Sequence, residues 1–179
     1  MSEMENLGIV QAGHPTLAST SEPFNLPGEI DEAARIISLL GAKLEEVRKT
    51  GPFAKGMGIA APQIGILRAA ALIDTSDAGL IVLLNPRLTA ASPESNDRYE
   101  GCLSFFDVRG LVPRPLAITV KYEDLSGAVA LGSFTEATAR LVCHEIDHLN
   151  GMVYTARMQP GVMPIPVEEY KQEGKPWTY

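Results

Sequence analysis

Apolar residues recur at alternating spacings of three and four positions along residues 29–49. They are Ile30, Ala33, Ile37, Leu40, Leu44 and Val47. This spacing places one apolar stripe along a helix, and Gly51-Pro52 is a sequence that ends a helix. The pattern therefore predicts an N-terminal amphipathic helix whose apolar face packs on a core.

From Arg68 onward the pattern changes to short apolar or alternating runs bounded by turn residues, which is typical of strands. The runs cover residues 69–73, 80–84, 116–122 and 128–131. Asp124-Leu125-Ser126-Gly127 predicts a turn between the last two runs, and hence a hairpin. Residues 92–97 are rich in Ser, Asn, Asp and Pro, so we expect them to form a loop.

A second helix is expected to begin where Ser133 is followed three residues later by Glu136, because this pair can form a capping box. The helix should run to about Asn150-Gly151, where glycine favours a stop. Its inward face carries Ala137, Leu141, His144 and His148. The two histidines are therefore expected to point into the protein with the apolar stripe.

The sequence His144-Glu145-Ile146-Asp147-His148 lies inside this helix and matches an HExxH pattern. Histidines four residues apart lie one turn apart on the same face, so both imidazoles can bind one metal ion. Glu145 is then placed to take a proton from water bound to that ion. A solvated helix with two idle histidines is the alternative, and the inward stripe favours the metal site.

A segment of small residues, Gly56 to Gly65, follows the first helix. Its glycines and alanines allow a ligand's main chain to approach the protein backbone. A phosphate-binding loop is the rival interpretation, but no lysine follows at the required position and no GxGxxG is completed. Gln63 is the polar side chain of this run, and its amide could donate a hydrogen bond to a developing oxyanion.

The composition of the chain excludes several classes of function. Its 179 residues are 45% hydrophobic and 21% charged, which favours a single ordered catalytic domain over residues 1–179. Residues 1–27 are expected to form an irregular N-terminal arm and residues 158–179 a tail containing Pro and Gly. The net charge of −7, without a basic stripe, argues against nucleic-acid specificity. No apolar run fits a membrane span or a signal peptide, so we expect a cytoplasmic location.

A catalytic metal site of this type takes three protein ligands, so one more ligand is needed. An HExxHxxGxxH pattern fails because Tyr154 stands where the third histidine would be. Glu168, 20 residues beyond the motif, is the ligand expected of an HExxH metallopeptidase. Cys102 could instead present a thiolate to the ion. Cys143 points about 100° away from the metal-binding face, so we expect it to be a small buried residue.

The sequence resembles the peptide deformylases of the bacterial type, through three separated motifs in that family's order. They are Gly56-Met57-Gly58-Ile59-Ala60-Ala61-Pro62-Gln63, Glu100-Gly101-Cys102-Leu103-Ser104 and His144-Glu145-Ile146-Asp147-His148. The resemblance covers residues 8–157 and is far more specific than the HExxH pattern alone. It implies an α+β fold with small antiparallel β-sheets packed around a central HExxH-bearing helix.

The resemblance also implies a role for each matching residue. Cys102, His144 and His148 would bind one divalent metal ion per chain, typically Fe2+ in this family, with Zn2+, Ni2+ or Co2+ as substitutes. Glu145 would act as general base and then as general acid, while Gln63 and the backbone N–H of Leu103 would stabilise the oxyanion. The residues expected to line the substrate site are Gly58, Ile59, Gly101, Ala137 and Leu141.

The implied reaction is removal of the N-formyl group from the N-terminal formyl-methionine of newly made polypeptides, with release of formate. The partners would be N-formyl-methionyl peptides or nascent chains, with transient association with the ribosome. Phe105-Phe106-Asp107 departs from the family's usual continuation of the second motif, and either phenylalanine could close one side of the substrate pocket. The alternatives are an HExxH metallopeptidase with Glu168 as third ligand and a non-catalytic deformylase-like binding protein.

Overall fold

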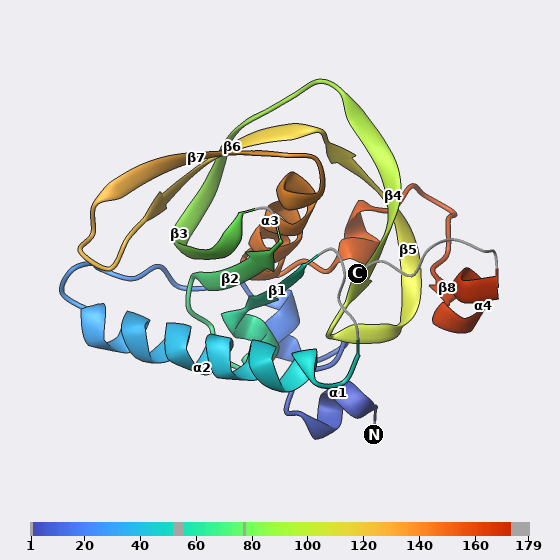
Figure 1. Cartoon of the computed structure of the whole chain (residues 1–179), viewed down its shortest axis with the longest axis horizontal. Coiled ribbons are helices and arrows are strands. Elements are labelled where there is room, and N and C mark those ends of the chain that lie inside the picture. Colours follow the sequence, from blue (N-terminus) through green and yellow to red (C-terminus); the bar gives the residue numbers. More distant parts are fainter. Residues whose placement is uncertain (1, 52–55, 77, 173–179) are drawn as a thin grey trace.

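The computed structural model describes residues 2–51, 56–76 and 78–172, which form helices and antiparallel strands (Figure 1). Helix α3 (Glu136–Leu149) lies between two separate sheets, and the long helix α2 (Ile30–Arg48) runs along the outside of the larger one. The arrangement is of the α+β class that the sequence predicts. Within the described residues, no helix combines the length and the apolar character needed to cross a membrane.

The larger sheet has five antiparallel strands in the order β1-β2-β3-β6-β7. These strands are β1 (Met57–Ala60), β2 (Ala70–Thr75), β3 (Gly79–Ala91), β6 (Ala117–Glu123) and β7 (Val129–Thr135). The hairpin predicted around Asp124-Leu125-Ser126-Gly127 is confirmed, because β6 pairs with β7 and places Tyr122 opposite Ala130. β1 and β7 are the two edges of this sheet.

Strand β3 is longer than the sequence suggests, because it continues through Asn85-Pro86, which reads as a turn. The register shifts between Leu84 and Arg87, so the two residues sit in a bulge, where a strand tolerates proline. The side chain of Asn85 accepts a hydrogen bond from the N–H of Phe24 at 2.8 Å and donates one to its carbonyl at 2.9 Å. This contact between distant segments stabilises the bulge and leaves no local sequence signal.

The smaller sheet joins β4 (Ser95–Cys102), β5 (Phe105–Pro115) and β8 (Ile165–Pro166) in that order. The loop predicted over residues 92–97 is wrong from Ser95 onward, where β4 begins. β4 is an edge strand with several exposed polar positions, so it lacks the apolar alternation that normally identifies a strand.

Helix α3 begins at Glu136, and the capping box predicted from Ser133 is wrong. Ser133 lies within β7, opposite Thr119 of β6, and is therefore part of the sheet. The N-cap is Thr135, whose side chain makes no capping hydrogen bond. The strand runs directly into the helix, and Glu136 makes the turn with a φ of 51°.

Helix α2 packs its apolar face against β1 and β2. Its buried residues are Ala33, Ile36, Leu40, Leu44 and Val47. They form one core cluster with Ile59 of β1 and Leu72 of β2. Burying each large aliphatic side chain stabilises the fold by roughly 1.5–3 kcal/mol. Ile30, at the first turn, is 40% exposed and contributes less than its place in the stripe suggests.

Both ends of the described chain contain short elements that sequence periodicity does not reveal. The arm expected to be irregular holds α1 (Glu3–Asn6), which starts at a capping box between Ser2 and Glu5, and a 3₁₀ turn at Pro15–Ala18. Near the other end, α4 (Val167–Gln172) follows β8, which pairs with β5. Residues 165–172 of the tail therefore lie against the smaller sheet, as Figure 1 shows.

Candidate metal centre

Helix α3 carries three of the residues on which the site depends, within the HExxH sequence. His144, Glu145 and His148 are buried, with at most 8% of their surface exposed. The two imidazole rings lie one helical turn apart, with 4.9 Å between their centroids. Helix α3 lies between the two sheets (Figure 1), which accounts for the burial of both histidines.

The end of β4 brings Cys102 to these histidines. Its Sγ lies 3.2 Å from Nε2 of His148. Potential ligand atoms of Cys102, His144 and His148 all lie within 4.8 Å of one another, and all three residues are buried. Two imidazole nitrogens and one thiolate suit a divalent transition metal such as zinc or iron. These three side chains could therefore hold one ion.

Cys143 is separate from this cluster. Its side chain packs in an apolar cluster with Val142 and Ile146. Burial raises the pKa of the Cys143 thiol to about 11, so the thiol stays protonated near neutral pH. The structure therefore agrees with the prediction that Cys143 is a small buried residue.

Glu100 contacts His144 on the side away from the cluster. Nδ1 of His144 lies 3.0 Å from Oε2 of Glu100, so an N–H at Nδ1 donates and Nε2 is left available for an ion. Arg114 donates to both carboxylate oxygens of Glu100, at 2.9 and 3.0 Å. Arg140 adds a further hydrogen bond at 2.7 Å. The carboxylate is thus held by three neighbouring side chains.

The charges behind the site form a buried, paired network. Burial alone would raise the pKa of Glu100, but the hydrogen bonds from His144 and Arg114 outweigh it and hold this pKa well below its usual value. Arg114 also donates to Asp147 at 2.6 Å, and Arg157 donates to the same carboxylate at 2.7 Å. The network therefore keeps Glu100 ionised beside His144.

Glu145 has a different environment from Glu100. Its Oε2 is buried and has no hydrogen-bond partner among the described residues. Burial raises the pKa of Glu145 to about 7. Gly58 packs so closely on it that a Cβ at that position would lie 2.2 Å from Oε1. A carboxylate with a pKa near neutrality can both accept and return a proton at physiological pH.

Gln63 lies in the 3₁₀ turn η2 (Ala61–Ile64), which follows β1. Its Oε1 accepts a hydrogen bond from the N–H of Ala60 at 2.8 Å, which fixes the orientation of the amide. Its Nε2 then lies 3.6 Å from Sγ of Cys102 and 3.3 Å from Oγ of Ser104. The N–H groups of Gln63 therefore point toward the cysteine of the cluster.

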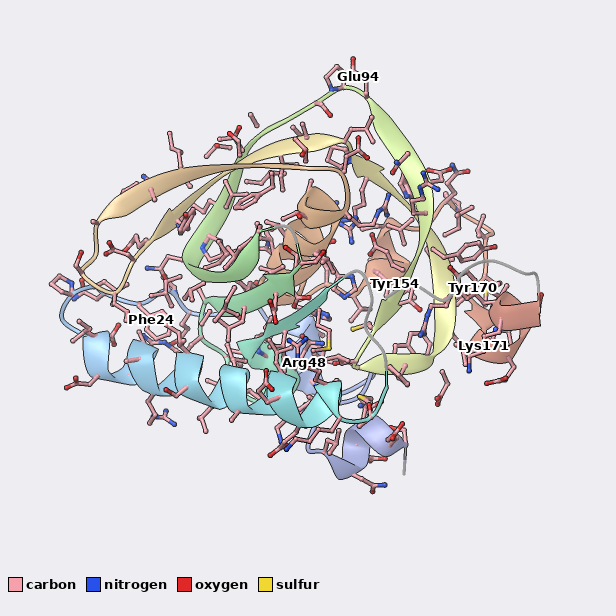
Figure 2. All side chains as sticks on the ribbon, viewed as in Figure 1. Phe24, Arg48, Glu94, Tyr154, Tyr170 and Lys171 are labelled. Atoms are coloured by element: carbon pink, nitrogen blue, oxygen red, sulfur yellow. The ribbon has the colours of Figure 1, made fainter. Side chains whose placement is uncertain are left out.

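A cavity of about 590 Å³ opens onto these residues. Its walls come from the edge strand β4, from α3 and from the β1–η2 segment, with Tyr170 of α4 at the outer side. In Figure 2, Tyr170 lies where α4 meets the smaller sheet. The predicted site residues on these walls are Gly58, Gln63, Gly101, Leu103, Ala137, Leu141, His144 and Glu145. The cavity thus joins motifs that are far apart in the chain.

The assignment of Ile59 to the substrate site is wrong. Ile59 is 0% exposed and packs in the core beneath α2. Successive side chains of a strand point to opposite faces, so Gly58 faces the cavity and Ile59 faces away from it.

Phe105 and Phe106 are not among the described residues that line the cavity. Phe105 stacks on Tyr154, with 6.2 Å between ring centroids, and Tyr154 stacks on His144 of α3, with 6.1 Å between ring centroids. Phe106 lies under the guanidinium of Arg109, 5.5 Å from it. Both phenylalanines therefore pack on other side chains, and neither closes a side of the cavity as predicted.

Glu168 is not brought to the histidines. It lies on α4, where 74% of its side chain is exposed, and pairs with Lys171 at 3.3 Å. The ligand set of the metallopeptidase alternative is therefore not formed.

Sequence reasoning missed three charged residues of the site. Arg140 and Asp147 lie four residues before and three after His144, so helical periodicity carried a signal for both. Arg114 lies in β5, and its local sequence gives no such signal.

Comparisons with known proteins identify relatives of this chain. The sequence model of a family described as polypeptide deformylase matches residues 6–162. Peptide deformylase 2 of Clostridium perfringens (strain 13 / Type A) is 35% identical over 150 residues, which cover 83% of this chain and 90% of that protein. Peptide deformylase of Chlorobium phaeobacteroides (strain BS1) is 39% identical over 132 residues, covering 70% of this chain and 69% of that protein.

Solved structures show the same fold. The Met-Ala-Ser-bound crystal structure of class I type b peptide deformylase from Acinetobacter baumannii is similar, with a TM-score of 0.73 and 29% sequence identity. The match covers 84% of this chain and 96% of that chain.

Proposed function

The chain belongs to the polypeptide deformylase family, and on this basis we propose that Cys102, His144 and His148 bind the metal ion of its active centre. The enzyme hydrolyses the N-formyl group of formyl-methionyl peptides and releases formate. The observation that supports this site is the close grouping of the three ligand side chains, together with a cavity whose wall includes His144 and Glu145.

The donor set fits a divalent transition metal. An ion bound there would lower the pKa of a coordinated water and polarise the formyl carbonyl. One thiolate and two imidazoles would accept Fe2+, Zn2+, Ni2+ or Co2+, so the ligands alone do not select the ion. We infer Fe2+ as the native ion from the resemblance to the family.

A thiolate-ligated ferrous centre is open to oxidation at both metal and sulfur. The iron form should therefore lose activity in air faster than the nickel form, and equal half-lives would argue against iron.

Glu145 is proposed as the proton carrier. Its carboxylate takes a proton from the attacking water as the new C–O bond forms at the formyl carbon. It then gives that proton to the leaving amine as the C–N bond breaks, which yields formate and a free N-terminus. A pKa raised to about 7 suits both transfers at neutral pH.

Gln63 and Leu103 are proposed as donors to the oxyanion. The amide of Gln63 is fixed by the N–H of Ala60, so its Nε2 needs no reorientation when negative charge develops on the formyl oxygen. Leu103 directly follows Cys102 and also lines the cavity, which supports a role for its backbone N–H. Glu100 acts through His144, whose imidazole it orients by accepting the Nδ1 hydrogen bond.

The substrate peptide is proposed to bind in an extended conformation along the outer edge of β4. Residues 96–101 of this edge strand line the cavity in succession, which leaves backbone groups available for a further strand. Gly58 and Gly101 leave room for the peptide main chain, and Ala137 and Leu141 form the apolar part of the side-chain pocket. We also propose a cytoplasmic location and transient association with the ribosome, and cosedimentation with ribosomes tests the second.

Formate release from formyl-Met-Ala-Ser under anaerobic conditions tests the proposed function. The metal-loaded protein should release formate from this peptide and leave acetyl-Met-Ala-Ser intact, because the close-walled site excludes bulkier acyl groups. A metallopeptidase would cleave the unformylated peptide instead, and a binding protein would bind the formyl peptide without turnover. Folded, metal-loaded protein that releases no formate would refute the proposal.

A further inference from the structure

The cavity that would receive the substrate's first side chain has a polar wall. Helix α3 contributes Arg140 to this polar wall, and β4 contributes Asn96, Arg98 and Glu100. Alternate residues of a strand share a face, so Arg98 lies on the same face of β4 as Glu100. The carboxylate of Glu100 reaches α3. Arg98 therefore faces the part of the cavity that lies between β4 and α3, which we call the slot.

Two charged side chains of this wall, Arg140 and Glu100, pair with each other. Nη1 of Arg140 donates to Glu100 at 2.7 Å and to the carbonyl of Val112 at 2.9 Å. Its Nη2 donates to the carbonyl and the side chain of Asn96, at 2.8 and 2.7 Å. Arg140 and Glu100 thus offset one another's charge and form a fixed boundary of the slot.

Arg98 differs from Arg140, because it is exposed and has no ion pair or side-chain hydrogen bond among the residues that the structure describes. Its guanidinium carries five N–H donors. Glu136, at the start of α3, lines the same cavity and is also exposed. A carboxylate in the slot would be attracted by Arg98 and repelled by Glu136. A neutral acceptor would gain the hydrogen bond without the repulsion.

We propose that Arg98 lets this enzyme deformylate peptides whose first side chain carries a neutral hydrogen-bond acceptor at the length of methionine, notably methionine sulfoxide. The inference rests on the proposed function. Oxidation of methionine to the sulfoxide adds one polar oxygen without lengthening the chain. An entirely apolar slot would leave that oxygen unpaired, whereas Arg98 can donate to it. Arg98 is therefore a specificity-determining residue for the substrate class.

The test compares kcat/KM for formyl-Met-Ala-Ser and for the same peptide with methionine sulfoxide. Arg98→Leu should lower the sulfoxide-to-thioether ratio about five- to tenfold, because a partly exposed charged donor is lost. Arg98→Lys keeps a cationic donor and should retain most of the ratio. Arg87→Leu removes an exposed strand arginine outside the cavity and should leave the ratio unchanged.

The outcomes separate this inference from the proposed function. An unchanged ratio in Arg98→Leu, with normal turnover of formyl-Met-Ala-Ser, would overturn the role of Arg98 alone. Faster turnover of a formyl-Glu than of a formyl-Gln peptide by the unmodified enzyme would overturn the preference for a neutral acceptor. Absence of formate from every peptide would overturn the proposed function, and this inference with it.

Discussion

Replacing Gly58 by alanine should disable the enzyme through a displacement of Glu145. A Cβ at position 58 would lie 2.2 Å from Oε1, 2.7 Å from Cδ and 2.8 Å from Cγ of Glu145. All three distances are below 3.0 Å, and Cβ atoms in proteins almost never lie that close to another heavy atom. The carboxylate must therefore move. The backbone at Gly58 is that of an ordinary strand and accepts alanine without strain.

The size of the effect follows from the size of the displacement. Relieving the closest contact requires a shift of about 0.8 Å, from 2.2 to 3.0 Å. A misplacement of about 1 Å at a reacting group costs on the order of 10²-fold in rate. We therefore expect kcat/KM for formyl-Met-Ala-Ser to fall about 50- to 100-fold, equivalent to roughly 2.3–2.7 kcal/mol. Metal binding should stay stoichiometric, because the three atoms nearest to the added methyl group all belong to Glu145 and none belongs to a proposed metal ligand.

Anaerobic formate release and metal analysis of the same samples measure both quantities. Gly41→Ala is the matched control, because the added Cβ in α2 would meet only Leu72, at 3.9 Å. Alanine is favoured over glycine within a helix by about 1 kcal/mol, so this variant should keep full activity with a slightly raised Tm. If Gly58→Ala retains a third or more of the activity, the position of the Glu145 carboxylate does not limit the rate.

Three further substitutions, two of them with a control variant, test separate parts of the site. Glu145→Gln should keep the metal and lower kcat by about 10²- to 10⁴-fold, because the proton carrier is lost; near-normal turnover would contradict its role. Cys102→Ala should abolish stoichiometric metal binding and Cys143→Ala should not, and metal analysis showing the reverse would refute the third-ligand assignment. Arg114→Met should lower the free energy of unfolding of the metal-free protein by about 3–5 kcal/mol, because two buried carboxylates lose their guanidinium. Arg48→Met, at an exposed ion pair, should cost about 0–1 kcal/mol, and urea denaturation measures both variants.

The sequence predicted those parts of the site that depend on local geometry. The spacing of His144 and His148 fixes their common helical face whatever the rest of the chain does. The same reasoning from residue spacing left Cys102 and Glu168 both open as third ligand, because neither is near the motif in sequence. Only the resemblance to a family favoured the cysteine, and the fold then brings its Sγ to 3.2 Å from His148.

The predictions for Ile59 and Ser133 are wrong because each residue's position in a β-strand determines where it lies. The motif places Ile59 beside Gly58, but alternation along β1 directs Ile59 into the core and Gly58 to the cavity. The spacing of Ser133 and Glu136 predicts a helix cap, but Ser133 lies within strand β7. In both cases a tertiary constraint overrode a valid local signal.

Strands β4 and β5 supply the part of the site that no local sequence pattern reveals. β4 is exposed and polar because it is an edge strand, so its sequence reads as a loop. That same free edge leaves backbone groups available to a peptide, and its polar face carries Glu100 to His144 and Arg98 to the slot. Arg114 on β5 then neutralises Glu100. Sequence rules for strands assume burial on at least one face, so they fail for an exposed edge strand such as β4, the strand that we propose pairs with the peptide.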